Sequence, residues 1–339
     1  MSWKNTIANW LERSGAGALL GALPKRNVLM VFNYHRIGNP RSTLYDPDVF
    51  SATAAGLEAQ VAFLKKRLPL IGLAEALEIA GGKRKLTGAA GLITFDDGYR
   101  DNFDLAFPIL RSHGAPAVFF LVSSYVGSSY VPWWDEIAYL AKHSKKDTVR
   151  LQYPHELIFE NVRADPGVLA GKVTALYKQP DVDGERLLES LAEACQTERP
   201  GQSAERLFLD WDEARAMLRG GMDIASHTHT HRILSKLTPE EQYSEAFESK
   251  RILDSQLCIR VAAMAYPVGL RSSFSAETGQ ALERAGYRAA FSFYGGLNSD
   301  QIMSAFDIRR CAVDPRSAEL FRLRTALTSL TGKSCFYPR

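Results

Sequence analysis

GLITFDDG, residues 91–98, is the most informative stretch of the chain, because it places two adjacent carboxylates where an apolar strand ends. Residues 91–95 predict a short buried strand, and Gly98 marks the turn after it. Successive side chains at a strand end point in different directions, so Asp96 and Asp97 can have different neighbours. One carboxylate can then bind a metal ion while the other accepts a proton. Two acids in an apolar setting also require a nearby cation, although a solvated Asp-Gly turn would explain the same residues.

A second polar cluster, SHTHTH at residues 226–231, follows another short strand-like run at 221–225. Three of the seven histidines of the chain fall within five positions of this cluster. Neutral imidazole is a common zinc ligand. His227 and His231 can share one ion if the segment turns helically after the strand, whereas in an extended segment all three rings would share one face. A surface histidine tract without a metal is the alternative interpretation.

The two motifs together resemble the polysaccharide deacetylase family (NodB homology, carbohydrate esterase family 4). The resemblance implies that Asp96 is the catalytic base and that Thr228 or Thr230 braces the histidine loop. His229 has no assigned role by this match, and we place it beside the ligands or facing the substrate. The metal ligands that the resemblance implies are Asp97, His227 and His231.

The chain departs from the common family pattern in its third motif. That motif is Arg-x-Pro-x-Gly, and residues 265–269 read AYPVG, so alanine stands in the arginine position. Arg310, in the strand-like run 307–313, is our candidate for the arginine that orients the base, with a surface salt bridge as the alternative. By the same resemblance, the backbone N–H of Val268 would face the oxyanion, and Tyr266, Pro267 and Val268 would contact the substrate.

A second departure concerns the general acid, because no histidine follows His231. A circularly permuted subgroup of exopolysaccharide N-deacetylases, which this chain resembles, supplies its acid from the N-terminal strand. Residues 28–34 predict such a strand, and His35 follows it directly. We therefore expect His35 to be the general acid, the alternative being a structural histidine.

The implied activity is the hydrolysis of N-acetyl groups on a polysaccharide or glycan precursor, releasing acetate and a free amine. The implied cofactor is a divalent metal ion, Zn²⁺ first, with Co²⁺ or Ni²⁺ as alternatives that two histidines and one aspartate do not separate. The sequence leaves open an O-acetyl esterase or deformylase on the same scaffold. It also leaves open a non-catalytic sugar-binding relative, and the absence of the arginine from the third motif favours that alternative.

Strands alternate with helices along the chain, which predicts an α/β fold with a parallel sheet or barrel. The family resemblance implies a distorted (β/α) barrel of about seven strands (NodB-like). Expected strands are residues 28–34, 91–95, 117–122, 222–226, 261–266, 289–293 and 308–313. Expected helices are 48–67, 102–113, 239–257 and 275–285, with one more opened by the capping-box pattern at 210–213. In barrels, reactive groups gather at the carboxyl ends of the strands.

We expect a barrel domain over residues 26–330, interrupted at 127–210 by an insertion with helices near 134–143 and 184–195. Trp134 in this insertion could stack on a sugar ring, although packing in a core is the more common role. Residues 1–25 predict an N-terminal helix that packs on the domain or rests on a membrane surface. Residues 331–339 form a C-terminal tail.

Composition agrees with an ordinary globular enzyme, since 46% of residues are hydrophobic and 23% are charged. A net charge of +3 without a long basic run gives no indication of nucleic-acid binding. The four cysteines are widely spaced, which argues against a disulfide framework and fits a reducing compartment. No clear signal peptide or stretch of about 20 apolar residues is present, so we expect a cytoplasmic protein. The sequence does not indicate the oligomeric state.

Overall fold

The computed structural model describes residues 26–203, 205–299, 303–313 and 318–334, so the expected N-terminal helix at 1–25 lies outside the described residues. The chain divides into two compact units. The first, here called the barrel unit, contains Met1–Gly38, Phe50–Gly127 and Phe208–Arg339. The second, here called the insertion unit, contains Asn39–Val49 and Ser128–Leu207. The segment Asn39–Val49 was expected within the barrel.

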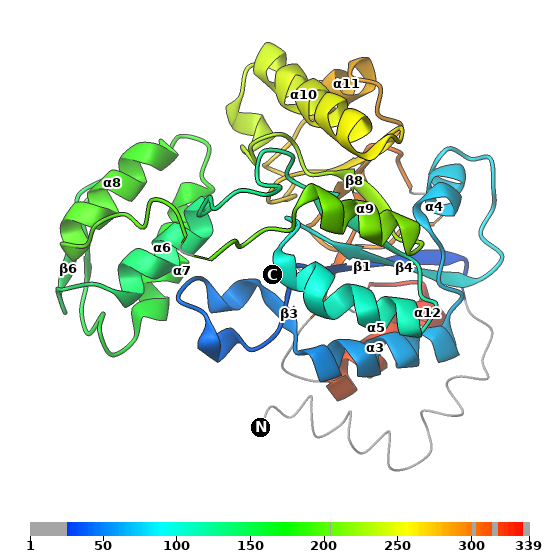
Figure 1. Cartoon of the computed structure of the whole chain (residues 1–339), viewed down its shortest axis with the longest axis horizontal. Coiled ribbons are helices and arrows are strands. Elements are labelled where there is room, and N and C mark those ends of the chain that lie inside the picture. Colours follow the sequence, from blue (N-terminus) through cyan, green and yellow to red (C-terminus); the bar gives the residue numbers. More distant parts are fainter. Residues whose placement is uncertain (1–25, 204, 300–302, 314–317, 335–339) are drawn as a thin grey trace. The chain divides into compact units, whose positions relative to one another are not determined.

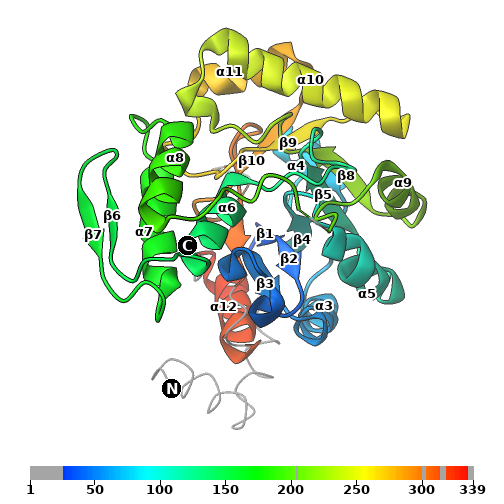
Figure 2. The ribbon, with the colours of Figure 1, turned by 60° about the vertical axis from the view of Figure 1, so that its left-hand side comes forward.

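A parallel sheet forms the centre of the barrel unit (Figures 1 and 2). Its strands are β1 (Val28–Tyr34), β4 (Ala89–Phe95), β5 (Ala117–Leu121), β8 (Asp223–Ser226), β9 (Ala263–Ala265), β10 (Ala289–Ser292), β11 (Ile308–Arg309) and β12 (Cys311–Ala312). Their order is β11-β10-β9-β8-β5-β4-β1-β12, with every pairing parallel. Only Arg310 separates β11 from β12, yet the two strands stand at opposite ends of this order.

Residues 308–312 therefore act as one segment that pairs with β10 through its first half and with β1 through its second. If β11 and β12 are counted as one strand, the described residues form a barrel of seven strands. The predicted α/β class and distorted barrel are confirmed.

Helices surround this sheet, as Figure 2 shows for α3, α5, α9, α10 and α12. The helices of the barrel unit are α3 (Ala54–Arg67), α4 (Leu73–Ala80), α5 (Phe107–Ser112), α9 (Trp211–Arg219), α10 (Pro239–Leu257), α11 (Ala276–Arg284) and α12 (Ala318–Thr331). The predicted capping box is present at the start of α9, where Asp210 accepts from the Glu213 N–H and the Glu213 side chain accepts from the Asp210 N–H.

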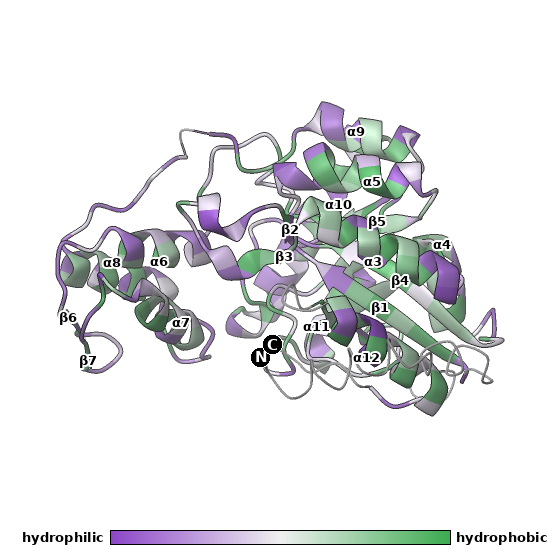
Figure 3. Ribbon diagram, turned by 90° about the horizontal axis from the view of Figure 1, so that it is seen from below, coloured by the Kyte–Doolittle hydropathy of each residue, from purple (hydrophilic) through white to green (hydrophobic). Residues whose placement is uncertain are grey.

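Side chains alternate between the two faces of each strand, as the period of two requires. One row, including Met30 and Phe32 of β1, packs against the surrounding helices. The other row fills the barrel interior, and β1 is coloured as hydrophobic along most of its length in Figure 3. The inward row consists of Leu29, Val31, Ala90, Leu92, Val118, Phe120, Ala225, Ala263, Ala265, Ala289, Phe291 and Ile308. The same alternation points the residues at the carboxyl ends of these rows into the open end of the barrel.

Helix α4 packs against this inward row at the other end of the barrel. Its first backbone N–H, that of Leu73, donates to Asp223 Oδ2 at 2.8 Å, at the start of β8. The amino-terminal ends of the strands are therefore covered by α4.

Two expected helices begin differently from the sequence pattern. The helix expected from residue 48 starts at Ala54, because the Thr53 side chain caps it. The residues before it form η2 (Pro47–Val49) and β3 (Phe50–Ala52), which pairs with β2 (Arg36–Ile37). The helix expected over 102–113 begins as a π-helical segment, η3 (Asn102–Ala106), and continues as α5.

The insertion unit contains η1 (Pro40–Ser42), α6 (Trp133–Lys142), α7 (Pro166–Tyr177), α8 (Gly184–Cys195) and the antiparallel pair β6 (Val149–Leu151) and β7 (Leu157–Phe159). Trp133 stacks on Tyr177 with ring centroids 4.0 Å apart. Trp134 meets Trp133 edge-on and is 6% exposed. Its ring is a core side chain of this unit, so the structure does not support the sugar-stacking role expected for it.

Along the described residues, every helix is too short or too polar to span a lipid bilayer. The described cysteines, Cys195, Cys258 and Cys311, carry free thiols.

Candidate active site

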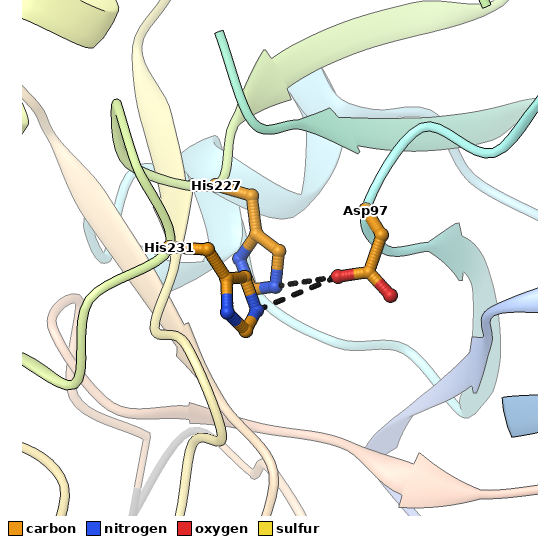
Figure 4. Close-up of side chains that lie close together, drawn as sticks. All are labelled: Asp97, His227 and His231. Atoms are coloured by element: carbon orange, nitrogen blue, oxygen red, sulfur yellow. Dashed lines mark ion pairs between the residues drawn. The ribbon is translucent and has the colours of Figure 1, made fainter. Parts of the chain in front are cut away.

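Three predicted metal ligands converge at the carboxyl end of the barrel (Figure 4). Asp97 follows β4, and His227 and His231 follow β8, a strand separated from β4 by β5 alone. The Nε2 atoms of His227 and His231 lie 3.4 and 3.5 Å from Asp97 Oδ1. All three residues are buried, with 2 to 6% of their surface exposed.

This spacing fits a tetrahedral metal site. Two ligand atoms about 2.05 Å from a tetrahedral zinc ion stand about 3.3 Å apart. The observed separations from Asp97 Oδ1 come close to that value, and all three ligand atoms lie within 4.8 Å of one another. The other ring nitrogen of His227, Nδ1, bonds to the Ala265 carbonyl oxygen at 2.9 Å. That bond assigns the proton to Nδ1 and leaves the Nε2 lone pair directed toward Asp97.

The electrostatics of the trio also suit a cation. Burial first, and then the neighbouring His227, lower the pKa of His231 to about 3, so the ring is neutral near pH 7. Burial also lowers the pKa of His227, but the Asp96 and Asp97 carboxylates outweigh it and raise that pKa overall. Two carboxylates therefore place negative charge within a buried cluster of imidazoles, as a divalent ion requires.

Asp96 is held on both carboxylate oxygens by the barrel interior. Arg310 Nη1 donates to Oδ1 at 2.6 Å, and Asn33 Nδ2 donates to Oδ2 at 3.0 Å. Arg310 is 1% exposed and also donates to Asn33 Oδ1 and to the Ser292 carbonyl oxygen. Burial raises the pKa of Asp96, but the charges of Arg310, His227 and His35 outweigh it and hold that pKa well below its usual range. Asp96 is thus ionised at neutral pH.

His35, the expected general acid, lies on the same side of the barrel as Asp96. Its Nε2 is 3.8 Å from Asp96 Oδ2, and 17% of its side chain is exposed. Its backbone is fixed at both ends of the residue: the N–H donates to Ser51 Oγ at 2.9 Å, and the carbonyl oxygen accepts from Asn102 Nδ2 at 2.7 Å. The structure therefore brings His35 to the predicted base rather than leaving it remote.

Backbone strain is concentrated around this cluster. Seven non-glycine residues among those described have positive φ, and four of them belong to the site: Asp97 (72°), Thr228 (67°), His231 (59°) and Val268 (64°). Left-handed backbone is unfavourable for side chains other than glycine and is retained where the surroundings impose it, commonly at functional sites. Thr228 braces the loop from within, since its Oγ1 accepts from the His231 N–H at 3.0 Å.

Residues 265–269, which replace the third motif, offer the site backbone groups more than side chains. Tyr266 is 1% exposed, stacks on Phe274, and donates its hydroxyl to the Phe306 carbonyl oxygen at 2.9 Å. A direct side-chain contact of Tyr266 with substrate is therefore not supported. Among the described residues, the Val268 N–H donates to no acceptor, which leaves it available. Pro267 is buried just before it.

The His229 side chain has a partner outside the ligand trio. Its Nδ1 bonds to Ser123 Oγ at 2.9 Å, and its backbone N–H donates to Glu245 Oε2 on α10. His229 is consequently absent from the ligand cluster. This agrees with the expectation that it is not a ligand.

Sequence reasoning missed two residues that hold the site, Asn33 and Glu245. Asn33 stands two positions before His35, so period-two alternation continued one residue past the end of β1 would have placed the two side chains on one face. Glu245 lies on α10, 15 residues beyond Thr230, and no local pattern links the two.

Comparison with known proteins decides the family. The family model described as polysaccharide deacetylase matches residues 83–165 and 172–290, more than half of the chain. The chain belongs to the polysaccharide deacetylase family. The match leaves out β1 with His35 and the closing segment with Arg310, so the placement of those two residues comes from the structure alone.

Among curated proteins, YxkH of Bacillus subtilis (strain 168), provisionally named a polysaccharide deacetylase, is 25% identical over 225 residues. This match covers 66% of the present chain, which spans about half (51%) of the length of YxkH.

Solved structures share the fold at low sequence identity. Streptococcus pyogenes deacetylase PplD, solved in complex with acetate, superposes with a TM-score of 0.58 at 16% identity, covering 90% of this chain and 99% of that one. IcaB from Ammonifex degensii superposes with a TM-score of 0.56 at 17% identity, covering 90% and 98%.

Proposed function

We propose that this protein is a metal-dependent deacetylase that hydrolyses N-acetyl groups of a polysaccharide or glycan precursor. The single observation that carries the proposal is the position of Asp96. Its Oδ2 lies 3.8 Å from His35 Nε2 and 4.0 Å from His227 Nε2, while Arg310 occupies its other oxygen. An ionised base, an imidazole and a ligand trio thus meet in one cluster. The family membership supports the same assignment.

Asp97, His227 and His231 would hold the metal, which we expect to be Zn²⁺, with Co²⁺ or Ni²⁺ as alternatives. When bound, a divalent ion supplies Lewis-acid polarisation of the acetyl carbonyl and lowers the pKa of an attacking water. The hydrogen bond from His227 Nδ1 to the Ala265 carbonyl oxygen orients that ring for the task.

The residues of the chain then move two protons. Asp96 Oδ2 accepts a proton from the attacking water as a C–O bond forms at the acetyl carbon. The Val268 N–H, which has no acceptor among the described residues, can donate to the carbonyl oxygen as negative charge develops there. His35 Nε2 donates a proton to the amide nitrogen as the C–N bond breaks. The products are acetate and a free amine, and the proton on nitrogen matters because an amide anion is a very poor leaving group.

Arg310 replaces the missing motif arginine in this proposal. It approaches Asp96 from the closing segment of the barrel instead of from the end of β9, where Ala265 stands. The guanidinium keeps the base ionised and occupies Oδ1. Oδ2 is then the oxygen directed at His35 and His227.

The test is acetate release from matched N-acetylated and O-acetylated oligosaccharides by wild type, Asp96→Asn and His35→Ala. We expect release from the N-acetyl substrate, with a loss of about 10²–10⁴-fold in kcat in each variant. Release from the O-acetyl substrate alone would favour an esterase. Binding of oligosaccharide without release of acetate, formate or another acyl group would favour a non-catalytic sugar-binding protein.

A further inference from the structure

Helix α10 directs a buried carboxylate at the loop that carries the metal ligands. Glu245 is 7% exposed. Its Oε2 accepts from the backbone N–H groups of His229 and Thr230 at 3.0 and 2.8 Å, and the Thr230 hydroxyl donates to Oε1. Among the described residues, no lysine or arginine forms an ion pair with this carboxylate. The hydrogen bonds that the two carboxylate oxygens accept therefore come from the loop.

The loop requires such support because its backbone is strained. Thr228 and His231 both adopt left-handed φ, at 67° and 59°, on either side of the two residues that Glu245 binds. The bond from the His231 N–H to Thr228 Oγ1 closes the loop from within. Glu245 holds it from outside by satisfying two consecutive N–H groups that the turn directs toward α10. Strained backbone of this kind persists only where its surroundings fix it.

We propose that Glu245 is a positioning residue for the metal site. By holding residues 228–231 in this conformation, it keeps His231 Nε2 within reach of Asp97 Oδ1 and thereby sets the affinity for the metal. The inference rests on the proposed metal-dependent function. Loss of a group that orients a metal ligand typically weakens binding by about 10–100-fold.

The chemistry of the three hydrogen bonds predicts an order among variants. Glutamine keeps one oxygen that can accept from the two N–H groups but loses the charge that strengthens these bonds. Alanine removes every acceptor and leaves two partly buried N–H groups without their partner. Metal affinity is therefore expected to fall from wild type to Glu245→Gln and further to Glu245→Ala. Glu248→Gln, one turn along α10 at a residue that pairs with Arg251, is the matched control.

The experiment measures the zinc dissociation constant of each metal-free protein by competition with a chromophoric chelator. We expect 10–100-fold weaker binding for Glu245→Ala, a smaller loss for Glu245→Gln, and the wild-type value for Glu248→Gln. The visible absorption of the Co²⁺ form should change in Glu245→Ala, because the ligand geometry changes. Circular dichroism of the metal-free proteins checks folding, and Glu245→Gln decides the matter if the alanine variant does not fold.

Wild-type affinity together with an unchanged cobalt spectrum in folded Glu245→Ala, or in Glu245→Gln if that variant has to decide, would overturn this inference alone. Failure of the wild-type protein to bind Zn²⁺ or Co²⁺ would overturn the proposed function with it. The two results are distinguishable in one titration series.

Discussion

The contact between Arg310 and Asp96 gives the sharpest prediction, because one buried cation controls the ionisation of the proposed base. Arg310→Gln removes that charge and the bond to Asp96 Oδ1, which is 2.6 Å long between two side chains that are 1 and 3% exposed. Burial alone raises the pKa of Asp96, and the guanidinium is the largest influence that lowers it. Without Arg310 the pKa of Asp96 must therefore rise.

An opposite charge this close lowers the pKa of a carboxyl group by about 1–3. The base works only when ionised, so a higher pKa moves the acid limb of kcat/KM to higher pH by roughly one to three pH units. The free energy of unfolding depends on this pKa as well. A depressed folded-state pKa stabilises the protein above the unfolded pKa, and this contribution is lost as the pH falls through the folded value. Leaving a buried carboxylate without its partner costs about 3–5 kcal/mol in the free energy of unfolding.

The assay is the pH dependence of kcat/KM for acetate release from about pH 2 to about pH 8, because the wild-type pKa of Asp96 lies well below the ordinary aspartate value of about 3.9. A folded fraction that stays constant with pH scales kcat/KM without moving the midpoint of the acid limb, so a destabilised variant remains informative over the pH range in which its folded fraction is unchanged. Arg310→Lys keeps the charge and should move the limb less. Arg309→Gln changes the neighbouring residue, whose side chain is 25% exposed and contacts Asp307 and Tyr294, and should leave the limb in place. Circular dichroism at each pH checks that loss of rate is not unfolding.

An acid limb at the wild-type position in Arg310→Gln, with a folded protein, would refute the idea that this guanidinium keeps the base ionised. If the acid limb of kcat/KM moves as far in Arg309→Gln as in Arg310→Gln, the shift results from the loss of any positive charge and not from the contact with Asp96.

Three further predictions follow from other contacts. Chelation should abolish acetate release and lower the thermal midpoint, with both restored by Zn²⁺, because a ligand at 1,000 times its Kd stabilises the fold by about 4 kcal/mol. Asn33→Ala removes the bond to Asp96 Oδ2 and should lower kcat/KM about tenfold without changing zinc affinity, as a chelator competition would show. Gly269→Ala (φ +65°) would place Cβ 2.6 Å from the Phe293 backbone nitrogen, whereas at Gly221 (φ +87°) a Cβ meets nothing within 4 Å. Thermal melts should therefore show a greater loss for Gly269→Ala than for Gly221→Ala, by more than about 1 kcal/mol.

The strands and most helices of the barrel could be predicted from sequence, because local patterns fix them. The run 28–34 is apolar on both faces, as a strand between a packed interior and a layer of helices requires, and it forms β1 over the same residues. Capping residues gave helix starts, as at Asp210. The start expected at residue 48 was wrong because residues 50–52 pair with β2, a tertiary contact that no local pattern records.

The site was predictable where its chemistry is concentrated in a motif. Asp96, Asp97, His227 and His231 stand in two short polar runs after strands, and parallel strands bring such ends together. Asn33 escaped prediction because an asparagine at the end of an apolar strand has no distinctive signal of its own. Glu245 escaped it because its partners are backbone N–H groups exposed by left-handed turns at Thr228 and His231, a conformation that those residue types do not announce.

The last strand of the barrel is divided into β11 and β12, and its position late in the chain affects when the proposed site is complete during synthesis. Residues 308–312, which close the barrel, also carry the Arg310 guanidinium that lowers the pKa of Asp96, the proposed base. A nascent chain emerging from the ribosome would possess both histidines and the aspartate pair long before it acquired that charge. Under the proposed function, hydrolysis therefore requires the closing segment as well as the two motifs, because a polypeptide that ends before residue 308 would carry the proposed metal ligands but would leave Asp96 poorly ionised.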